Sequence, residues 1–314
     1  MTAPTVTPPG VSDAPAEPPL EQVFPPPWLR KLGSRFLNLY AALALVYLFL
    51  PIFVIVAFSF NQPKGRFNLV WQQFTLDNWK DPFAVPELVD AFLFSLKIAA
   101  IATAVAVVFG ALVSLSLCRY RFRGSGAVNM LLVLPLTTPE IVLGASLGSI
   151  FILQVYPLPV PQALGEGTII IAHVMFCVSF VALTVKARLR GFDWTLEEAG
   201  ADLGAGPVRV FTKVTLPLML PGILAAALLS FALSLDDFII TLFNASPENV
   251  TFPLYIYGAR QRALPPQINV LATVILVVSV ALLASGTLFQ RIRERRSGRG
   301  EIAAPRAIVM PMED

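Results

Sequence analysis

The sequence predicts an all-α membrane protein with six transmembrane helices and with both termini in the cytoplasm. Only 14% of its 314 residues are charged, whereas 56% are hydrophobic and the mean hydropathy is +0.71. Soluble domains carry roughly a quarter charged residues, so these charges cannot cover the surface of a soluble protein of this length. The apolar residues gather in six long runs, and most basic residues lie in the segments that connect them on one side. This composition excludes an ordinary soluble enzyme and a largely disordered chain.

The six apolar runs are long enough to be membrane spans. The first has 22 residues without a charge, or about 33 Å of helix, which matches the thickness of the hydrocarbon core. The second is interrupted only by Lys97, whose long side chain we expect to reach the nearby membrane surface. The fourth contains His173, which we expect to be a hydrogen-bonded packing residue rather than a proton switch. The predicted spans are Leu39–Phe60, Ala91–Cys118, Ala127–Leu153, Thr168–Val185, Leu218–Phe243 and Ile268–Gln290.

The segments outside the spans set the domain limits and the orientation. Residues 1–35 form a proline-rich tail that we expect to be disordered, residues 36–292 form the membrane domain, and residues 293–314 form a second tail. The two tails, the connections 119–126 and 186–217, and Arg291 just after the last span together hold 17 of the 23 Lys and Arg residues. Because such residues are enriched in cytoplasmic loops, the termini and these two connections are predicted to be cytoplasmic. No removable signal peptide is expected.

Several kinds of site find no support in the composition. A net charge of +3 gives no reason to expect a nucleic-acid-binding surface. His173 is the only histidine, and the two cysteines lack the spacing of metal ligands. No metal site and no cofactor are therefore predicted.

The connection 193–217 has the pattern of a helix, a sharp turn and a second helix. Thr195 and Glu198 form a capping-box pattern at the start of the first helix. Gly204 and Gly206 are predicted to supply a left-handed turn, and Pro207 to begin a second helix that stops before Pro217. The small residues of the first helix allow close approach to another surface. That surface is either a partner protein or the rest of this chain.

The same residues resemble the EAA loop of ABC-importer permeases. Glu198-Ala199-Gly200 is followed after three residues by Gly204 and after nine more by Val214-Thr215-Leu216-Pro217. The spacing matches throughout, although Gly200 and Val214 replace the Ala and Ile of the family pattern. The resemblance implies a type I permease fold in which this loop is a coupling helix that docks on a cytoplasmic ATPase. The docking residues that it implies are Glu198, Ala199, Gly200, Leu203 and Gly204.

A wider resemblance covers residues 36 to 292 and points to spermidine/putrescine importers. The segments that carry it are 129–144, 233–238, 252–257 and 266–273, and they are most similar to the C-type permease subunit of that family. The resemblance implies a bacterial inner-membrane location, a second permease subunit, two ATPase subunits and an extracytoplasmic binding protein as partners. It also implies alternating access driven by ATP. The chain has no G-x-x-x-x-G-K-[ST] sequence of its own, so a partner must hydrolyse ATP.

Three acidic residues lie inside the predicted spans and are candidates for the substrate path. Glu140 lies in the third span, and Asp236 and Asp237 lie in the fifth. Carboxylates inside a membrane usually face water, protein or substrate, and a polyamine requires acids and aromatic rings along its path. Each also has a structural alternative. Glu140 follows Pro139 and can cap a restarted helix, and adjacent aspartates point about 100° apart, so at least one should bind a neighbouring group.

Other functions stay open at this level. Related importers carry opines, phosphonates or amino-acid-like solutes, and the external binding protein largely decides between such substrates. A self-sufficient secondary transporter would require inverted repeats, which the two halves of the chain do not display convincingly. An intramembrane enzyme lacks support because the chain contains neither G-x-S-x-G nor H-E-x-x-H.

Overall fold

The computed structural model describes residues 27–120, 122–153 and 163–281, and the side chains from residue 35 onward. Within these ranges the ordered elements are helices, and the only β-type pairing is two isolated bridges. The chain divides into two units, residues 1–54 and 55–314. The all-α prediction is confirmed for the described residues. The predicted tails 1–26 and 282–314 lie outside them.

The first unit is built around α1 (Pro27–Phe58), whose last residues belong to the second unit. Its apolar part, Arg35–Phe58, has 24 residues and the hydropathy of a membrane span, as the sequence predicts. A helix that is apolar on all sides is suited to lipid or to a partner subunit.

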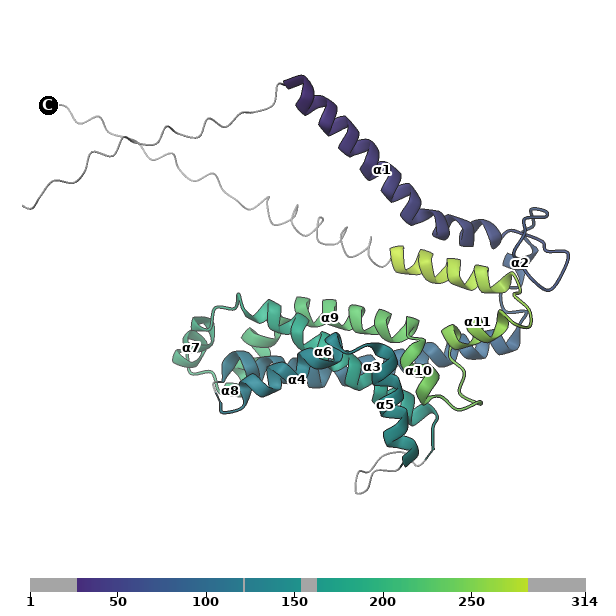
Figure 1. Ribbon diagram of the computed structural model, residues 1–314. Coiled ribbons are helices and arrows are strands. Elements are labelled where there is room, and N and C mark those ends of the chain that lie inside the picture. The colour runs from purple at the N-terminus through teal and green to yellow at the C-terminus, as the bar shows by residue number, and fades with distance from the viewer. Residues whose placement is uncertain (1–26, 121, 154–162, 282–314) are drawn as a thin grey trace, which may run out of the picture. The chain divides into compact units, whose positions relative to one another are not determined.

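The centre of the second unit is a group of three long helices. These are α3 (Pro86–Arg119), α6 (Glu166–Leu189) and α9 (Leu216–Asp236), which lie side by side in Figure 1. Their shared core includes Ala106, Val181 and Ala226, all fully buried. The hydroxyl of Ser114 donates to the carbonyl of Ala182 at 2.5 Å and so joins α3 to α6. These helices confirm the second, fourth and fifth predicted spans as membrane-length helices.

The third predicted span is broken into two helices at its prolines, and whether the pair crosses the membrane as one span stays a prediction. It consists of α4 (Ser125–Thr137) and α5 (Glu140–Leu153), which meet at an angle of 108°. Pro139 explains the bend, because a proline cannot continue the hydrogen bonding of a helix and forces the preceding residue out of helical geometry. Thr138 indeed has φ −81° and ψ 132°, in the extended region. The helix restart at Glu140 is confirmed.

The fifth predicted span differs at both of its ends. Helix begins at Pro207 in α8 (Pro207–Val210), passes through the π-helical turn η1 (Phe211–Thr215) and continues into α9. The predicted stop before Pro217 is therefore wrong. A π-turn is wider than an α-turn, so it relieves the clash between the Pro217 ring and the preceding turn. At the other end the helix breaks after Asp236, and α10 (Ile239–Asn244) follows as a separate element.

Glycines allow two of the helix contacts to be close. On α5, Gly144 and Gly148 face α10, and a Cβ on Gly148 would lie 2.6 Å from the carbonyl oxygen of Phe243. On α3, a Cβ on Gly110 would lie 2.6 Å from Val181 Cγ1 and 3.0 Å from the Ala182 nitrogen. Small residues at such positions are typical of helix packing inside membranes.

Connections that the Lys and Arg counts assign to the same side of the membrane lie together in the structure. The long connection after α1, which contains α2 (Asp77–Lys80), pairs with the connection after α11 (Phe252–Ala259). Asn68 donates its backbone N–H to the Leu264 carbonyl at 3.0 Å, and Leu264 donates to the Arg66 carbonyl at 2.8 Å. At the other end of α3, Arg119 pairs with Glu197 of the 186–217 connection. Both pairings agree with the predicted sides, although the assignment of one side to the cytoplasm stays a prediction.

The number of six spans is also still a prediction. Four helices in the described ranges are long and apolar enough to cross a membrane, and the bent α4–α5 pair can make a fifth span. The last described helix, Gln267–Ala281, is shorter than a span. The remainder of the sixth predicted span lies outside the described residues.

The close contact at Gly110 predicts a destabilising effect of a single methyl group. Gly110→Ala should lower the thermal unfolding temperature of the purified protein in detergent, because overpacking costs about 1–3 kcal/mol. Gly126→Ala is the matched control, since nothing lies within 4 Å of a Cβ at that position in α4. It should leave stability unchanged or raise it slightly. Equal unfolding temperatures for the two variants would contradict the packing argument.

Candidate coupling helix and intramembrane acids

The candidate coupling helix is α7 (Thr195–Asp202), which lies with α8 at one end of α3, α6 and α9 (Figure 1). Its start differs from the predicted capping box. Asp193 accepts hydrogen bonds from the Thr195 hydroxyl at 2.7 Å and from the Thr195 N–H at 3.0 Å. The Thr195 hydroxyl therefore donates backward to Asp193 instead of capping the N–H of Glu198. The side-chain and backbone hydrogen bonds from Thr195 hold the pKa of the Asp193 carboxyl below its ordinary value.

The turn after α7 is a Schellman motif with Gly204 at its left-handed position. Gly204 has φ +80°, and its N–H donates to the Ala201 carbonyl at 2.8 Å. The N–H of Ala205 donates to the Gly200 carbonyl at 3.2 Å, which completes the motif. The prediction of a left-handed conformation is confirmed for Gly204 and wrong for Gly206, whose φ is −66°. Pro207 begins the next helix as predicted.

Four of the five residues predicted to dock on a partner face outward. Glu198, Ala199, Leu203 and Gly204 are exposed, and Leu203 is 89% exposed. Gly200 differs, because it is half-buried and a Cβ there would contact Val210 Cγ2 at 3.4 Å. Gly200 thus packs α7 against its own chain, whereas Leu203 offers a large apolar side chain to the surroundings.

The sequence reasoning missed Glu197, the neighbour of the predicted docking residue Glu198. Glu197 is only 7% exposed, and its Oε2 lies 2.9 Å from Arg119 Nη2 at the end of α3. The Thr215 hydroxyl of η1 donates to Glu197 Oε1 at 2.5 Å. Arg119 is therefore more than the membrane-flanking charge that the sequence suggested. The only sequence signal was the Glu-Glu pair itself, which does not say which carboxylate turns inward.

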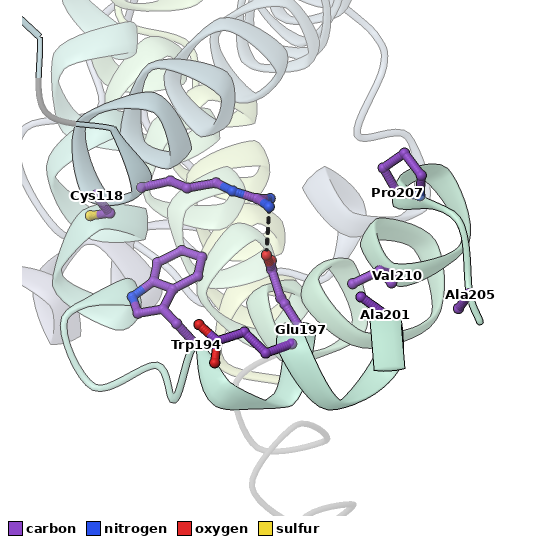
Figure 2. A pocket seen from close by; sticks show the side chains of 9 residues that line it. Cys118, Trp194, Glu197, Ala201, Ala205, Pro207 and Val210 are labelled. Carbon is purple, nitrogen blue, oxygen red and sulfur yellow. Dashed lines mark ion pairs between the residues drawn. The ribbon is translucent and has the colours of Figure 1, made fainter. Parts of the chain in front are cut away.

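A cavity of about 440 Å³ lies beside this ion pair. Figure 2 shows the Glu197 side chain reaching across it toward the ion-pair partner, with the Trp194 ring on the same side and Pro207 farther away. The ring centroids of Phe192 and Trp194 are 4.6 Å apart, and both side chains pack on the main core. The cavity is lined by Cys118, Arg119, Trp194, Glu197, Glu198, Ala201, Ala205, Pro207 and Val210.

The two adjacent aspartates have different surroundings, as the helix geometry predicts. Asp237 is 9% exposed and accepts hydrogen bonds from the N–H groups of Ile240 at 3.3 Å and Thr241 at 2.8 Å. It thereby caps α10. Asp236 is the last residue of α9, and it is exposed. The expectation that at least one aspartate binds neighbouring groups is confirmed by Asp237.

His173 completes the surroundings of Asp237. It is 2% exposed, and its Nε2 lies 3.2 Å from Asp237 Oδ2 and 3.0 Å from the Thr241 hydroxyl. Its Nδ1 lies 2.7 Å from the Ser234 hydroxyl. Each ring nitrogen thus has a partner, which confirms that His173 is a buried, hydrogen-bonded residue, whereas its not being a proton switch stays a prediction. This cluster joins α6 to α9 and α10 where the fifth span breaks.

The other charged residues predicted inside spans lie at helix ends or in pairs. Glu140 is exposed in the first turn of α5, where the helix dipole favours a carboxylate. Lys97 forms an ion pair that the sequence did not indicate, since its Nζ lies 2.6 Å from Glu166 Oε1 in the first turn of α6. No cluster of metal-ligating side chains occurs among the described residues.

The contrast between the aspartates predicts unequal effects on stability. Asp237→Ala should lower stability by about 3 kcal/mol, because it removes the α10 cap and a buried charged partner. Asp236→Ala should change stability by no more than roughly 0.5 kcal/mol, since Asp236 is exposed. Thermal unfolding of the purified protein in detergent measures both. The argument fails if the two substitutions shift the unfolding temperature equally.

Comparison with known proteins places the chain in a family. Residues 106–299 match the family described as binding-protein-dependent transport system inner membrane component. The spermidine/putrescine transport system permease protein PotC of Haemophilus influenzae is 36% identical over 82% of this chain and 98% of that protein. The PotC protein of Escherichia coli K12 is 35% identical over 78% of this chain and 90% of that protein. The putrescine transport system permease protein PotI of the same strain is 34% identical over 81% of this chain and 90% of that protein.

Solved structures give the same fold. A chain of a bacterial ABC transporter involved in the import of the acidic polysaccharide alginate aligns with a TM-score of 0.62 and 14% identity, over 84% of this chain and 98% of that one. A chain of the inward-facing methionine ABC transporter MetNI aligns with a TM-score of 0.51 and 18% identity, over 65% and 95%. From its sequence match, this chain belongs to the family of inner membrane components of binding-protein-dependent transport systems, and it is a multi-pass membrane protein.

Proposed function

We propose that this chain is a permease subunit of an ATP-driven importer for polyamines of the spermidine and putrescine class. The observation that carries the proposal is its identity of 34–36% to permeases named for these substrates, over about four-fifths of the chain. The likeness to solved ABC transporters supports the fold but not the substrate, because those structures are of an alginate importer and a methionine transporter. The chain itself takes no part in ATP hydrolysis.

The coupling step follows from the surface of α7. Leu203 is 89% exposed, which is the highest value for a large apolar side chain among the described residues. The exposed Glu198 precedes it on α7, and the left-handed turn at Gly204 follows it directly. This combination suits insertion into a complementary cleft of a cytoplasmic ATPase subunit. Two such ATPases, each holding one permease, convert nucleotide-driven closure into movement of the permease pair.

The transport step needs a second permease. Much of the apolar surface of α4 and α9 is exposed, including Met130, Leu131, Leu224 and Leu228. In the proposed importer the two permeases enclose the path between them and open alternately to the two sides of the membrane. An extracytoplasmic binding protein delivers the substrate to the side of the paired connections around Asn68 and Leu264.

The polar groups near the helix breaks fit a cationic substrate. Asp236 has an exposed carboxylate, and two residues later the ring of Phe238 lies 4.9 Å from that of Tyr257. Carboxylates and aromatic faces both attract ammonium groups, by charge and by cation–π interaction. Glu140 is a second exposed acid at a helix break. In this proposal Asp236 and Glu140 contact substrate, whereas Asp237 acts on the path by holding α10 in place.

The docking proposal predicts a specific effect of a charge at position 203. Leu203→Asp should weaken binding of the ATPase subunit by about 2 kcal/mol, or roughly thirtyfold, because it places a carboxylate in an apolar contact. Glu198→Lys should act in the same direction. The measurement is the amount of ATPase that co-purifies with the tagged permease.

Two controls separate docking from folding. Leu203→Met keeps an apolar side chain and should retain the ATPase, and Phe122→Asp places the same charge on another exposed residue of the predicted cytoplasmic side. Because Leu203 makes little contact with its own chain, Leu203→Asp should leave the unfolding temperature unchanged. Undiminished co-purification of the ATPase with Leu203→Asp would reject α7 as the docking element.

The substrate proposal predicts loss of polyamine uptake in a deletion strain. Uptake of labelled spermidine and putrescine should fall when the gene is deleted and return with a plasmid copy. Asp236→Asn should transport less than Asp236→Glu, which keeps the charge. Uptake of a labelled opine, a labelled phosphonate and a labelled amino acid is measured in the same strains to test the alternative substrates. If polyamine uptake is unchanged in a strain without a redundant importer, the polyamine assignment is wrong.

A further inference from the structure

Glu197 is a buried carboxylate whose partners belong to two other helical elements. Its two oxygens contact Arg119 at the end of α3 and Thr215 at the end of η1. Burying an ionised carboxylate is costly unless it is paired and hydrogen-bonded. Each oxygen of Glu197 has such a partner, at 2.9 Å and at 2.5 Å. The contact is therefore built into the fold, unlike a salt bridge between two exposed side chains, which contributes little.

The inward and outward faces of α7 have separate tasks. Glu197 and Gly200 are three residues apart and so lie on one face, and both turn toward the chain itself. Ala199 and Leu203 are four residues apart and are both exposed. Glu198 is also exposed, but it lines the cavity beside Glu197. The short helix α7, with the Leu203 that follows it, thus has exposed docking residues on one side and a buried charge on another.

The partners of Glu197 are placed where two spans begin or end. Arg119 is the last residue of α3, and Thr215 directly precedes α9. The chain already joins α7 to α6, through the short segment in which Phe192 and Trp194 pack on the core. Glu197 adds a link from α7 to the ends of both α3 and α9. A displacement of α7 would then reach all three central helices together.

The cavity beside the ion pair would let α7 move independently of α3 if the ion pair were absent. Close-packed protein interiors resist small movements, because contacts are lost on one side and overlap arises on the other. Here about 440 Å³ of space separates α7 from the end of α3, and Arg119 and Glu197 both line it. The ion pair spans a region that lacks dense packing, so it carries the connection that side-chain packing would otherwise supply.

We propose that Glu197, Arg119 and Thr215 form a coupling clamp that transfers movement of α7 to the ends of α3 and α9. The clamp rests on the proposed function, since that function supplies the force on α7. Glu197 is a positioning residue in this scheme and does not touch the ATPase. Its loss uncouples ATP hydrolysis from transport without removing the ATPase from the complex.

The test uses the complete importer, with both permeases, the ATPases and the binding protein, reconstituted in liposomes. Glu197→Gln keeps the shape and an acceptor for Thr215 but removes the charge. It should retain the ATPase at the wild-type ratio and hydrolyse ATP within about twofold of wild type. The amount of spermidine moved per ATP hydrolysed should fall about fivefold or more. Fivefold is the lower end of the range by which coupled sites usually affect each other.

Partner variants distinguish the clamp from a general structural role. Arg119→Gln should give the same loss, and the double variant should be no worse than either single one, since both remove one interaction. Arg119→Lys keeps the positive charge and should restore most of the transport per ATP. The proposal is overturned if transport per ATP is unchanged in Glu197→Gln, if the losses of the two single variants add, or if the ATPase no longer assembles.

A second readout does not depend on the substrate. Spin labels carried by non-natural amino acids at Asp202 and Arg123 report the distance between α7 and the connection after α3. With an intact clamp this distance should stay constant when ATP binds, and in Glu197→Gln it should change. If the wild-type importer fails to move spermidine, the polyamine assignment is wrong, but the clamp is still tested by this distance. A wild-type distance that changes on ATP binding as much as that of the variant would reject the clamp.

Discussion

A carboxylate that leaves water must take its partners from the protein, and this constraint organises both ends of the molecule. At the break between α9 and α10, Asp237 is held by two backbone N–H groups and by His173. Beside α7, Glu197 is held by Arg119 and Thr215. In both places the buried acid joins elements that are distant in the sequence, because a full set of partners is rarely available from a single helix. The neighbouring acids, Asp236 and Glu198, stay exposed and free for contacts with other molecules.

Breaks in the helices place these acids. Pro139 ends α4 and puts Glu140 in the first turn of α5, and the extended Asp237 ends α9 and begins a new capped helix. The freed backbone groups of such breaks must be satisfied inside the protein, since lipid offers no hydrogen bonds. At the second break Asp237 serves this need by accepting from the N–H groups of Ile240 and Thr241. Asn244 ties α10 to α5 by donating to the carbonyl of Gly144. Gly148 allows the close contact between α5 and α10 that brings these groups within reach. Polar side chains and glycines thus act together at the breaks.

The sequence predicted well what depends on local pattern, and less well what depends on neighbours. Long apolar runs identified the spans, and the spacing from Glu198 to Pro217 identified α7, the turn at Gly204 and the start at Pro207. The errors concern residues whose behaviour is decided by tertiary contacts. Pro217 looked like a helix end, but a π-turn accommodates it. Thr195 looked like a cap, but Asp193 binds its hydroxyl. Glu197 and Glu198 are alike in sequence, and only the position of Arg119 decides which one is buried.

In the proposed importer, the arrangement around α7 lets a short helix move three long ones. If α7 were held only by the segments that precede and follow it, it would be free to tilt, and force applied by the ATPase would be lost in that tilt. A second attachment on the opposite face removes this freedom, because α7 is then held by the chain at α6 and by Glu197 at α3 and α9. Three attachments define the orientation of a rigid body, whereas one leaves it free to rotate. In this proposal the docking surface and the ion pair of the buried Glu197 are complementary requirements for coupling, and each has little effect without the other.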